Sequence, residues 1–361
     1  MAVFADKLLH WFKRHGRTDL PWQQNPTPYR VWVSEIMLQQ TQVGTVIPYF
    51  QRFTEVFPTV KALAEADLDQ VLHLWTGLGY YARARNLHRA AGILQQDYEG
   101  AFPQRVDLLC ELPGIGRSTA GAIVALAHGK RATILDGNVK RVLTRCFAVA
   151  GWPEQSAVKR ELWELAERLT PTRQVGAYTQ AIMDLGATVC TRTRPACETC
   201  PLADQCQARQ ADAIDSYPGR KPARTLPVKA TVMHMLHNEY NNQVLLEKRP
   251  PSGIWGGLWS FPETASPEQV PEITTLTHSS SEPDDWPLVR HTFSHYHLDI
   301  TPIHRKIHTA SDVVMESERW LWYPLDQPAE VGLAAPVKKL LQQLQLRSAK
   351  THSADNRRGN S

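Results

Sequence analysis

The segment Leu112-Pro-Gly-Ile-Gly-Arg-Ser-Thr-Ala120 decides the fold. Its glycines, Gly114 and Gly116, allow the backbone to turn tightly before a helix, whose apolar face is predicted by the residues that follow. Such a turn presents successive N–H groups and a helix N-terminus to an anion. The segment is therefore either an ordinary connection between two helices or a hairpin that binds nucleic-acid phosphates through Gly114, Gly116 and Arg117.

The chain on both sides of this hairpin has the pattern of many short helices, from Ala2 to about Ala208. Apolar residues recur at three- and four-residue spacing, as in Leu162, Leu165 and Leu169. Short breakers containing Gly or Pro separate these segments, and no convincing strand alternation occurs. Helices are expected at 177–186 and from about Val139 onward.

After Cys206 the pattern changes to that of an α/β domain. Turn residues bound two of three predicted strands, and a linker rich in Pro, Gly and basic residues precedes them. The expected strands and helix are Ala230–Leu236, Val244–Glu247, Tyr296–Ile300 and Pro336–Leu346. The expected domains are 1–209, a linker at 210–228, a second domain at 229–346 and a polar, disordered tail at 347–361.

Composition limits the class of protein. At 361 residues, with 42% apolar and 21% charged residues, the chain suits two or three globular domains rather than a disordered or fibrous protein. It lacks a stretch apolar enough to span a membrane, and Met1–Arg14 lacks the continuous apolar region of a secretory signal, so a cytoplasmic location is expected. The net charge of +4 conceals an excess of 27 basic over 21 acidic residues within 1–225, which favours an anionic partner there.

Cysteine spacing predicts a metal or cluster site. Four of the six cysteines lie within 17 residues, at Cys190, Cys197, Cys200 and Cys206. Four thiolates accept either tetrahedral zinc or a [4Fe–4S] cluster, and the lack of two paired C-x2-C knuckles favours the cluster. Cys110 and Cys146 stand apart in apolar surroundings that suit buried thiols.

Two acidic residues have possible catalytic roles. Asp136 follows the hairpin and is either the N-cap of the next helix or a carboxylate that faces a bound nucleotide, with Lys140 placed to keep it ionised or to lie beside it. Glu35 shares a helical stripe with Val31 and Leu38. Burial there raises the pKa of a carboxyl, and a carboxyl held protonated can act as a general acid near neutral pH; the alternative is a rim carboxylate bonded to a neighbouring side chain.

These elements together resemble one family. The hairpin, then Leu135-Asp-Gly-Asn138, then the four cysteines appear in the order found in helix–hairpin–helix DNA glycosylases with an iron–sulfur cluster. Within them, the stretches 34–42 and 77–86 resemble the adenine DNA glycosylase (MutY-type) family. The resemblance covers residues 4–346. It implies two helical lobes and a [4Fe–4S] loop in a mainly α N-terminal region, followed by an α/β Nudix-like domain.

The resemblance implies an activity and a catalytic group. Family members remove adenine mispaired with 8-oxoguanine or guanine from duplex DNA, after flipping the base out of the stack. Glu35 then protonates adenine N7, Asp136 stays ionised and stabilises the sugar cation, and Asn138 assists Asp136.

Further positions match substrate-binding residues of the family. Gln180 matches the position that contacts adenine, and Gln40 and Tyr80 match residues that wedge into the duplex.

Relatives of the endonuclease III type carry a lysine where this chain has Ser118, and a hydroxyl cannot form a Schiff base, so a monofunctional enzyme is expected. Many adenine glycosylases have tyrosine there, which leaves open which group supports Asp136. Lys140 remains available for slow, incidental imine chemistry.

The second domain resembles the family's Nudix-like module. Gly256–Pro262 matches a nucleotide pyrophosphatase, but Glu263–Ser281 supplies only scattered acids where such hydrolases hold Mg²⁺, so no phosphate hydrolysis is expected. The stretch His291–His297 matches the loop that recognises 8-oxoguanine, with contacts from Phe293, Ser294 and His295. Its alternating histidines suit zinc less well, because no cysteine or carboxylate completes a site.

Two alternatives remain. One is a glycosylase-lyase for pyrimidine lesions, which Ser118 disfavours. The other is a non-catalytic protein that binds DNA or senses redox state, although binding alone needs neither Glu35 nor Asp136. The expected partner is double-stranded DNA, bound by a monomer at the bacterial nucleoid and not at a membrane; the sequence identifies no protein partner.

Overall fold

The computed structural model describes residues 2–222, 225–269, 271, 277–279, 284–310 and 319–358. The chain folds into two compact units, which are Met1–Glu65 with Asn86–Ala223, and Ala66–Arg85 with Arg224–Ser361. The second unit thus includes a segment, 66–85, that lies within the predicted catalytic domain. The predicted domain boundaries near 209 and 229 stay a prediction.

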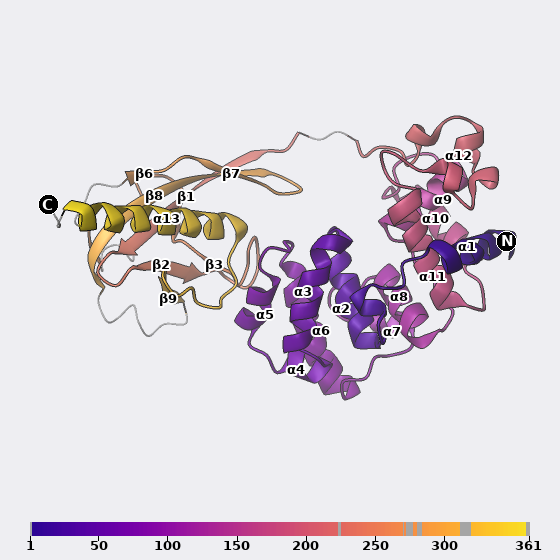
Figure 1. The fold of residues 1–361 in the computed structure, drawn as a ribbon, viewed down its shortest axis with the longest axis horizontal. Coiled ribbons are helices and arrows are strands. Elements are labelled where there is room, and N and C mark those ends of the chain that lie inside the picture. The colour runs from indigo at the N-terminus through magenta and orange to yellow at the C-terminus, as the bar shows by residue number, and fades with distance from the viewer. Residues whose placement is uncertain are drawn as a thin grey trace. The chain divides into compact units, whose positions relative to one another are not determined.

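The first unit is helical (Figure 1). Its helices are α1 (Ala2–His15), α2 (Pro28–Leu38), α3 (Val43–Val56), α4 (Val60–Ala64), most of α6 (Ala82–Tyr98), α7 (Val106–Cys110), α8 (Arg117–His128), α9 (Gly137–Cys146), α10 (Ser156–Leu169), α11 (Val175–Asp184) and α12 (Gln207–Gln210). A π-helix, Leu185–Val189, continues α11. Among the described residues before Val228 no strand occurs, so the helical prediction is confirmed.

The predicted hairpin connects α7 to α8. Gly114 adopts a φ of +80°, a left-handed conformation that favours glycine, and Gly116 is the N-cap of α8. The buried apolar faces of α1, α9, α10 and α11 share one core cluster, which includes Leu8, Leu143 and Leu162. Ala122 of α8 belongs to the same cluster, so this core also fixes the helix that leaves the hairpin.

The second unit is a mixed sheet with helices α5 (Leu68–Trp75) and α13 (Ala335–Arg358) (Figure 1). Its strands are β1 (Val228–Asn238), β2 (Gln243–Lys248), β3 (Trp259–Ser260), β4 (Glu263–Thr264), β5 (Thr277–Ser279), β6 (Asp284–Asp285), β7 (Val289–Thr292), β8 (His297–Ala310) and β9 (Trp320–Pro324). Strands β1 and β8 pair in parallel, whereas β2 pairs antiparallel with β1 and β9, and β7 pairs antiparallel with β8. The three predicted strands correspond to β1, β2 and β8.

The C-terminal helix differs from its prediction. Val337, Leu340, Leu341 and Leu344 bury one face of α13, as predicted for 336–346. However, α13 continues to Arg358, so the prediction of disorder from 347 is wrong as far as Arg358. The reason is that the polar residues after 346 include neither Gly nor Pro before Gly359, so nothing in the sequence stops the helix.

Two further predictions concern the thiol of Cys110 and the stretch 263–281. Cys110, predicted to be buried, is exposed, because it is the last residue of the short helix α7. The stretch 263–281, predicted to lack a Mg²⁺-binding helix, lies partly outside the described residues, at 270, 272–276, 280 and 281, and its described part contains strands β4 and β5. Over the part of the chain that is described, the helices are too short or too polar to cross a bilayer.

Candidate active site and cluster site

Glu35 lies on α2 among buried apolar neighbours. The helix starts at Pro28 behind the N-cap Thr27, whose side chain accepts the Arg30 N–H, and it buries Val31, Trp32 and Ile36. Glu35 is itself only partly exposed, and among the described residues no hydrogen-bond partner is found for its carboxyl. The choice between a general acid and a rim carboxylate stays a prediction.

Asp136 lies at the N-terminus of α9. Its Oδ1 accepts the Val139 N–H at 2.8 Å, so the predicted N-cap role is confirmed. Its Oδ2 accepts from Asn138 Nδ2 at 3.1 Å. Capping and a catalytic role are compatible, because a cap holds the carboxylate in a fixed position.

The two carboxyls interact and differ in their ionisation. Burial raises the pKa of Glu35 to about 8, and the nearby charge of Asp136 adds to this effect. Burial also raises the pKa of Asp136, but the hydrogen bonds from the Val139 N–H and Asn138, together with the charge of Arg141, oppose the shift. At neutral pH the proton of the pair therefore belongs to Glu35, which is the arrangement that an acid and a stabilising carboxylate require.

Arg141, which the sequence analysis missed, supports Asp136 in place of Lys140. Arg141 Nη2 donates to Asn138 Oδ1 at 2.8 Å, and its Nε donates to the Cys190 carbonyl at 2.6 Å. The Lys140 ammonium instead forms an ion pair with Glu154, so the prediction that Lys140 keeps Asp136 ionised is wrong. The spacing of Asn138 and Arg141, three residues apart on one helix face, was the available signal.

Ser118 fixes the backbone that leads to Asp136. Its Oγ accepts the Leu135 N–H at 2.9 Å. The hydroxyl in the first turn of α8 thus holds the residue before the carboxylate. This contact identifies one support for Asp136 where the sequence left the supporting group open.

Gln180 on α11 is oriented by a buried ion pair. Its Nε2 donates to Asp184 Oδ1 at 3.0 Å, and the Asp184 side chain is 1% exposed. Arg17 binds the same carboxylate through its backbone N–H (2.8 Å), Nε (2.9 Å) and Nη2 (2.6 Å). Because the amide nitrogen of Gln180 faces Asp184, its carbonyl oxygen is the atom that remains to accept a hydrogen bond.

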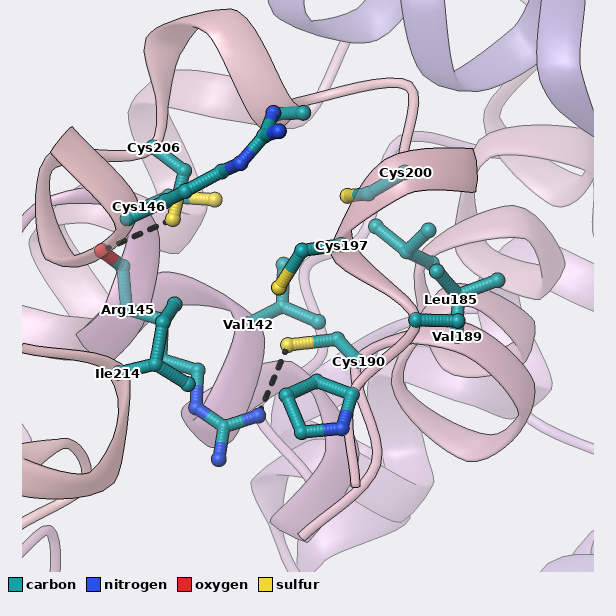
Figure 2. Close-up of a pocket in the computed structure, with 14 residues that line it drawn as sticks. Val142, Arg145, Cys146, Leu185, Val189, Cys190, Cys197, Cys200, Cys206 and Ile214 are labelled. Atoms are coloured by element: carbon teal, nitrogen blue, oxygen red, sulfur yellow. Dashed lines mark hydrogen bonds between the residues drawn. The ribbon is translucent and has the colours of Figure 1, made fainter. Parts of the chain in front are cut away.

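The four clustered cysteines line a common cavity (Figure 2). It encloses about 360 Å³, part of which is open to solvent, and apolar residues such as Val142, Leu185 and Ile214 complete its wall. Four thiols around one cavity are the donor set that a [4Fe–4S] cluster requires.

Arg145 is a second arginine that the sequence analysis missed. It is 2% exposed, and its Nη1 donates to Cys190 Sγ at 3.4 Å and to the Thr191 carbonyl at 2.7 Å. Its Nε donates to the Tyr217 carbonyl at 3.0 Å. A buried guanidinium therefore ties the cysteine loop to α9. Cys146, predicted to stand apart, also lines the cavity (Figure 2).

The predicted phosphate-binding hairpin is exposed at Gly114, Gly116 and Arg117. The guanidinium of Arg117 forms an ion pair with Glu167 and stacks 4.0 Å from the centre of the Trp163 ring. The two glycines thus leave backbone groups at the surface, while the Arg117 side chain has partners within the protein.

Both predicted wedge residues have left-handed backbone conformations. In the first unit, Gln40 has a φ of +57° in the turn after α2 and is exposed. In the second unit, Tyr80 has a φ of +51° and is 53% exposed. Buried Arg83 donates to the Leu78 and Gly79 carbonyls at 3.1 and 3.0 Å and thereby braces the Tyr80 loop. Strain in non-glycine residues is typical of functional positions.

In the second unit, the turn between β7 and β8 carries the predicted lesion-reading residues. The Phe293 N–H donates to the Tyr296 carbonyl at 2.9 Å, and the Phe293 ring packs 5.3 Å from that of Trp255. Ser294 and His295 are exposed at its tip. The rings of His291 and Phe293 are also in contact, 4.6 Å apart, so the turn is held by aromatic packing.

Comparison with known protein families identifies three regions. A model described as the HhH-GPD superfamily of base excision DNA repair proteins matches residues 33–168. An iron–sulfur binding domain of endonuclease III matches residues 190–206, and a NUDIX domain matches residues 231–343. The cofactor of the cysteine loop is therefore a [4Fe–4S] cluster, as predicted, and the predicted fold of both regions is confirmed.

Individual relatives agree with this assignment. The chain is similar to the thermostable thymine-DNA glycosylase of a solved structure, with 28% identity and a TM-score of 0.53 over 58% of this chain and 96% of that one. It is 33% identical to the adenine DNA glycosylase of Rattus norvegicus, over 92% of this chain and 77% of the relative. It is 39% identical to the adenine DNA glycosylase of Buchnera aphidicola subsp. Acyrthosiphon pisum (strain APS), over 94% of this chain and 97% of the relative. Since such identity extends over nearly the full length of both sequences, the chain belongs to the adenine DNA glycosylase family.

Proposed function

We propose that the chain is a monofunctional glycosylase that removes adenine mispaired with 8-oxoguanine or guanine from duplex DNA, in base excision repair in the cytoplasm. The observation that carries the proposal is the pairing of Glu35, protonated at neutral pH, with the capped carboxylate of Asp136. Two carboxyls with separated pKa values are what hydrolysis of an N-glycosidic bond needs.

The proposed reaction gives the two carboxyls different roles. Glu35 donates its proton to N7 of the flipped adenine, so the bond between N9 and C1′ breaks and the base departs neutral. Asp136 stabilises the cationic sugar, held by Val139 and Asn138. Water then adds to C1′, and its proton returns to the Glu35 carboxylate. The products are free adenine and an abasic site.

Base recognition is assigned to Gln180. With its amide nitrogen bound to Asp184, the carbonyl oxygen of Gln180 is left as the acceptor for the base. The exocyclic amine of adenine is a donor, whereas a 6-oxo purine presents an acceptor at the same place. The Arg17–Asp184 pair thus favours adenine by fixing one orientation of the amide.

We assign the expected lack of strand cleavage to two side chains. The Ser118 hydroxyl accepts the Leu135 N–H and has no amine chemistry. The Lys140 ammonium is held by Glu154, and an ion-paired ammonium is not a nucleophile.

The remaining binding roles concern DNA and the cluster. We assign the hairpin backbone at Gly114 and Gly116 to DNA phosphates, and Gln40 and Tyr80 to insertion beside the flipped base. The tip residues Ser294 and His295 contact 8-oxoguanine, with Phe293 as their aromatic anchor. The cluster ligands are Cys190, Cys197, Cys200 and Cys206. The enzyme acts as a monomer.

The test uses purified holoprotein on labelled duplexes with adenine opposite 8-oxoguanine, guanine or thymine, analysed with and without alkali. Strand breaks that require alkali and occur only in the first two duplexes are expected. Breaks without alkali would contradict the assignment of Ser118 and Lys140. DNA binding without any base loss would favour the non-catalytic alternative. Glu35→Gln, which keeps the shape of the side chain, is the matched inactive control.

A further inference from the structure

A fifth thiol borders the cluster cavity. Cys146 is the last residue of α9, is 6% exposed and lines the same cavity as the four cysteines of the loop (Figure 2). The Cys146 sulfur lies beside the Cys206 sulfur on the wall of this cavity (Figure 2), within the range in which a thiol can act on its neighbour. Cys146 belongs to a different element from the ligand loop, and four cysteines already satisfy a [4Fe–4S] cluster. Its sulfur therefore lies beside the cluster without being needed as a ligand.

The surroundings of Cys206 create a need for a donor. Its sulfur lies 3.4 Å from the Arg145 carbonyl oxygen, to which a neutral thiol donates. Cluster binding converts Cys206 to a thiolate, which has no proton to donate, so two electron-rich atoms then face each other. The Cys146 S–H is a side-chain polar hydrogen adjacent to this sulfur and, together with the backbone N–H groups of Ala208 and Arg209, offsets the repulsion.

A parallel contact exists at the first cysteine of the loop. Arg145 Nη1 donates to Cys190 Sγ at 3.4 Å. Consecutive residues at the end of α9, Arg145 and Cys146, thus donate to the first and last cysteines of the loop. Hydrogen bonds to ligand sulfurs stabilise the more reduced, more negative state of a cluster and raise its reduction potential.

We propose that Cys146 is a positioning residue of the cluster site, a non-ligand thiol that donates its S–H to the Cys206 sulfur, retains this last ligand and raises the reduction potential of the cluster. The inference concerns the cluster alone and does not depend on base excision. It gives a role to a thiol that the cysteine spacing pattern leaves outside the ligand set.

The experiment compares full-length holoprotein with two variants. Cys146→Val keeps approximately the volume of the side chain and removes the donor, whereas Cys146→Ser keeps a donor. The measurements are iron content, the midpoint potential by protein-film voltammetry, and the rate of absorbance loss under ferricyanide. For Cys146→Val we expect a more negative potential and a loss of cluster that is roughly two- to tenfold faster, the size expected for one hydrogen bond. Cys146→Ser should remain close to the native protein.

Two results would overturn the proposal. One is a Cys146→Val protein with native potential and native cluster lifetime. The other is a Cys146→Ser protein as impaired as Cys146→Val, because the effect would then follow from packing. If Cys146→Val fails to fold, electron–nuclear double resonance on the oxidised cluster of the native protein in H₂O and in D₂O tests the proposal, because it detects exchangeable protons near the cluster. An exchangeable proton coupled to the cluster that Cys146→Ser shifts supports the proposal, and a signal that Cys146→Ser leaves unchanged refutes it. Cys110→Ala, at the exposed thiol, is the control.

Discussion

Glu35 sets the pH range in which the proposed site works. Because burial raises its pKa to about 8, the carboxyl is protonated at neutral pH and loses its proton above that value. The single-turnover rate of adenine release should therefore fall about tenfold per pH unit above pH 8. Glu35→Gln should lower the rate at pH 7 by roughly 10²- to 10⁴-fold while DNA affinity persists. A rate that stays flat to pH 10 would exclude Glu35 as the acid.

The same carboxyl lowers stability at higher pH. Its pKa is near 4.5 in an exposed chain and about 8 in the fold, so the folded state holds a proton that the unfolded state releases between these values. The contribution of Glu35 to the free energy of unfolding therefore decreases as pH rises through this window. Glu35→Gln should increase the free energy of unfolding at pH 8 by about 1–3 kcal/mol, as measured by urea denaturation. If the free energies of unfolding of Glu35→Gln and the native protein differ by the same amount at pH 5 and at pH 8, the raised pKa of Glu35 is contradicted.

At the level of residues, the sequence predicted which side chains belong to the site better than it predicted the contacts that they make. The capping role of Asp136 could be predicted because it depends on the few residues that follow it. The partner of the Lys140 side chain could not be predicted, because Glu154 lies beyond the end of α9. The role of Cys146 was hidden for the same reason, since only folding brings it to Cys206, 60 positions later.

At the level of elements, the contact between α9 and the π-helix after α11 depends on Gly186. A Cβ at this position would lie 2.6 Å from the Asn138 Cβ and 3.0 Å from backbone atoms of Asn138. Gly186→Ala should therefore displace Asn138 from Asp136, lower the rate of base excision and cost about 1–3 kcal/mol of stability. Kinetics and thermal denaturation would show this effect.

Gly44 provides the matched control for this substitution. It lies near the start of α3, and nothing within 4 Å would meet an added Cβ. Gly44→Ala should be neutral or stabilise the protein by about 0.5–1 kcal/mol, because alanine favours a helix. Equal effects of the two substitutions would show that the close contact at Gly186 is unimportant.

Strand β1 makes the second unit sensitive to acid. Burial lowers the pKa of His234 to about 4, and it also lowers the pKa of His304 on β8. The unfolded chain takes up protons below about pH 6.5, before the folded chain does, so stability should fall between pH 6.5 and pH 4. Hydrogen exchange in β1 should be faster at pH 5 than at pH 7, after correction for the intrinsic rate. His234→Gln should reduce this difference.

Strand and helix positions could be predicted where local pattern dominates. The strands at 230–236 and 244–247 are short apolar runs with turn residues next to them, and β1 and β2 extend the predicted segments by one to two residues at each end. The end of α13 could not be placed, because polarity alone does not distinguish a solvated helix from a disordered tail.

At the level of the whole molecule, the second unit is built from two distant parts of the chain. The Tyr81 hydroxyl donates to the Leu333 carbonyl at 2.8 Å, and Lys248 Nζ donates to Asp69 Oδ2 at 2.9 Å. Arg85 Nη1 donates to the Gly256 carbonyl at 2.7 Å. Sequence alone placed 66–85 with its neighbours along the chain, because pairing over such a separation leaves no local pattern.

Removal of residues 224–361 should therefore affect more than lesion reading. The truncated chain loses these partners of 66–85, so amide exchange in this segment should accelerate at least tenfold, the factor equivalent to about 1.4 kcal/mol. Exchange in α8 should remain unchanged and is the internal control. Equal protection of 66–85 in both chains would show that the segment is stable without the C-terminal part.

The split second unit also has a consequence for protein synthesis. The ribosome makes residues 66–85 long before residues 224–361, so the nascent segment has to wait for its partners while the intervening helices emerge. During that interval Leu72 and Trp75, buried in the finished fold, lack their final packing. Completion of the second unit thus requires the capture of an early segment by a late one, and a chain that stops prematurely is left with an exposed apolar helix for chaperones and proteases to recognise.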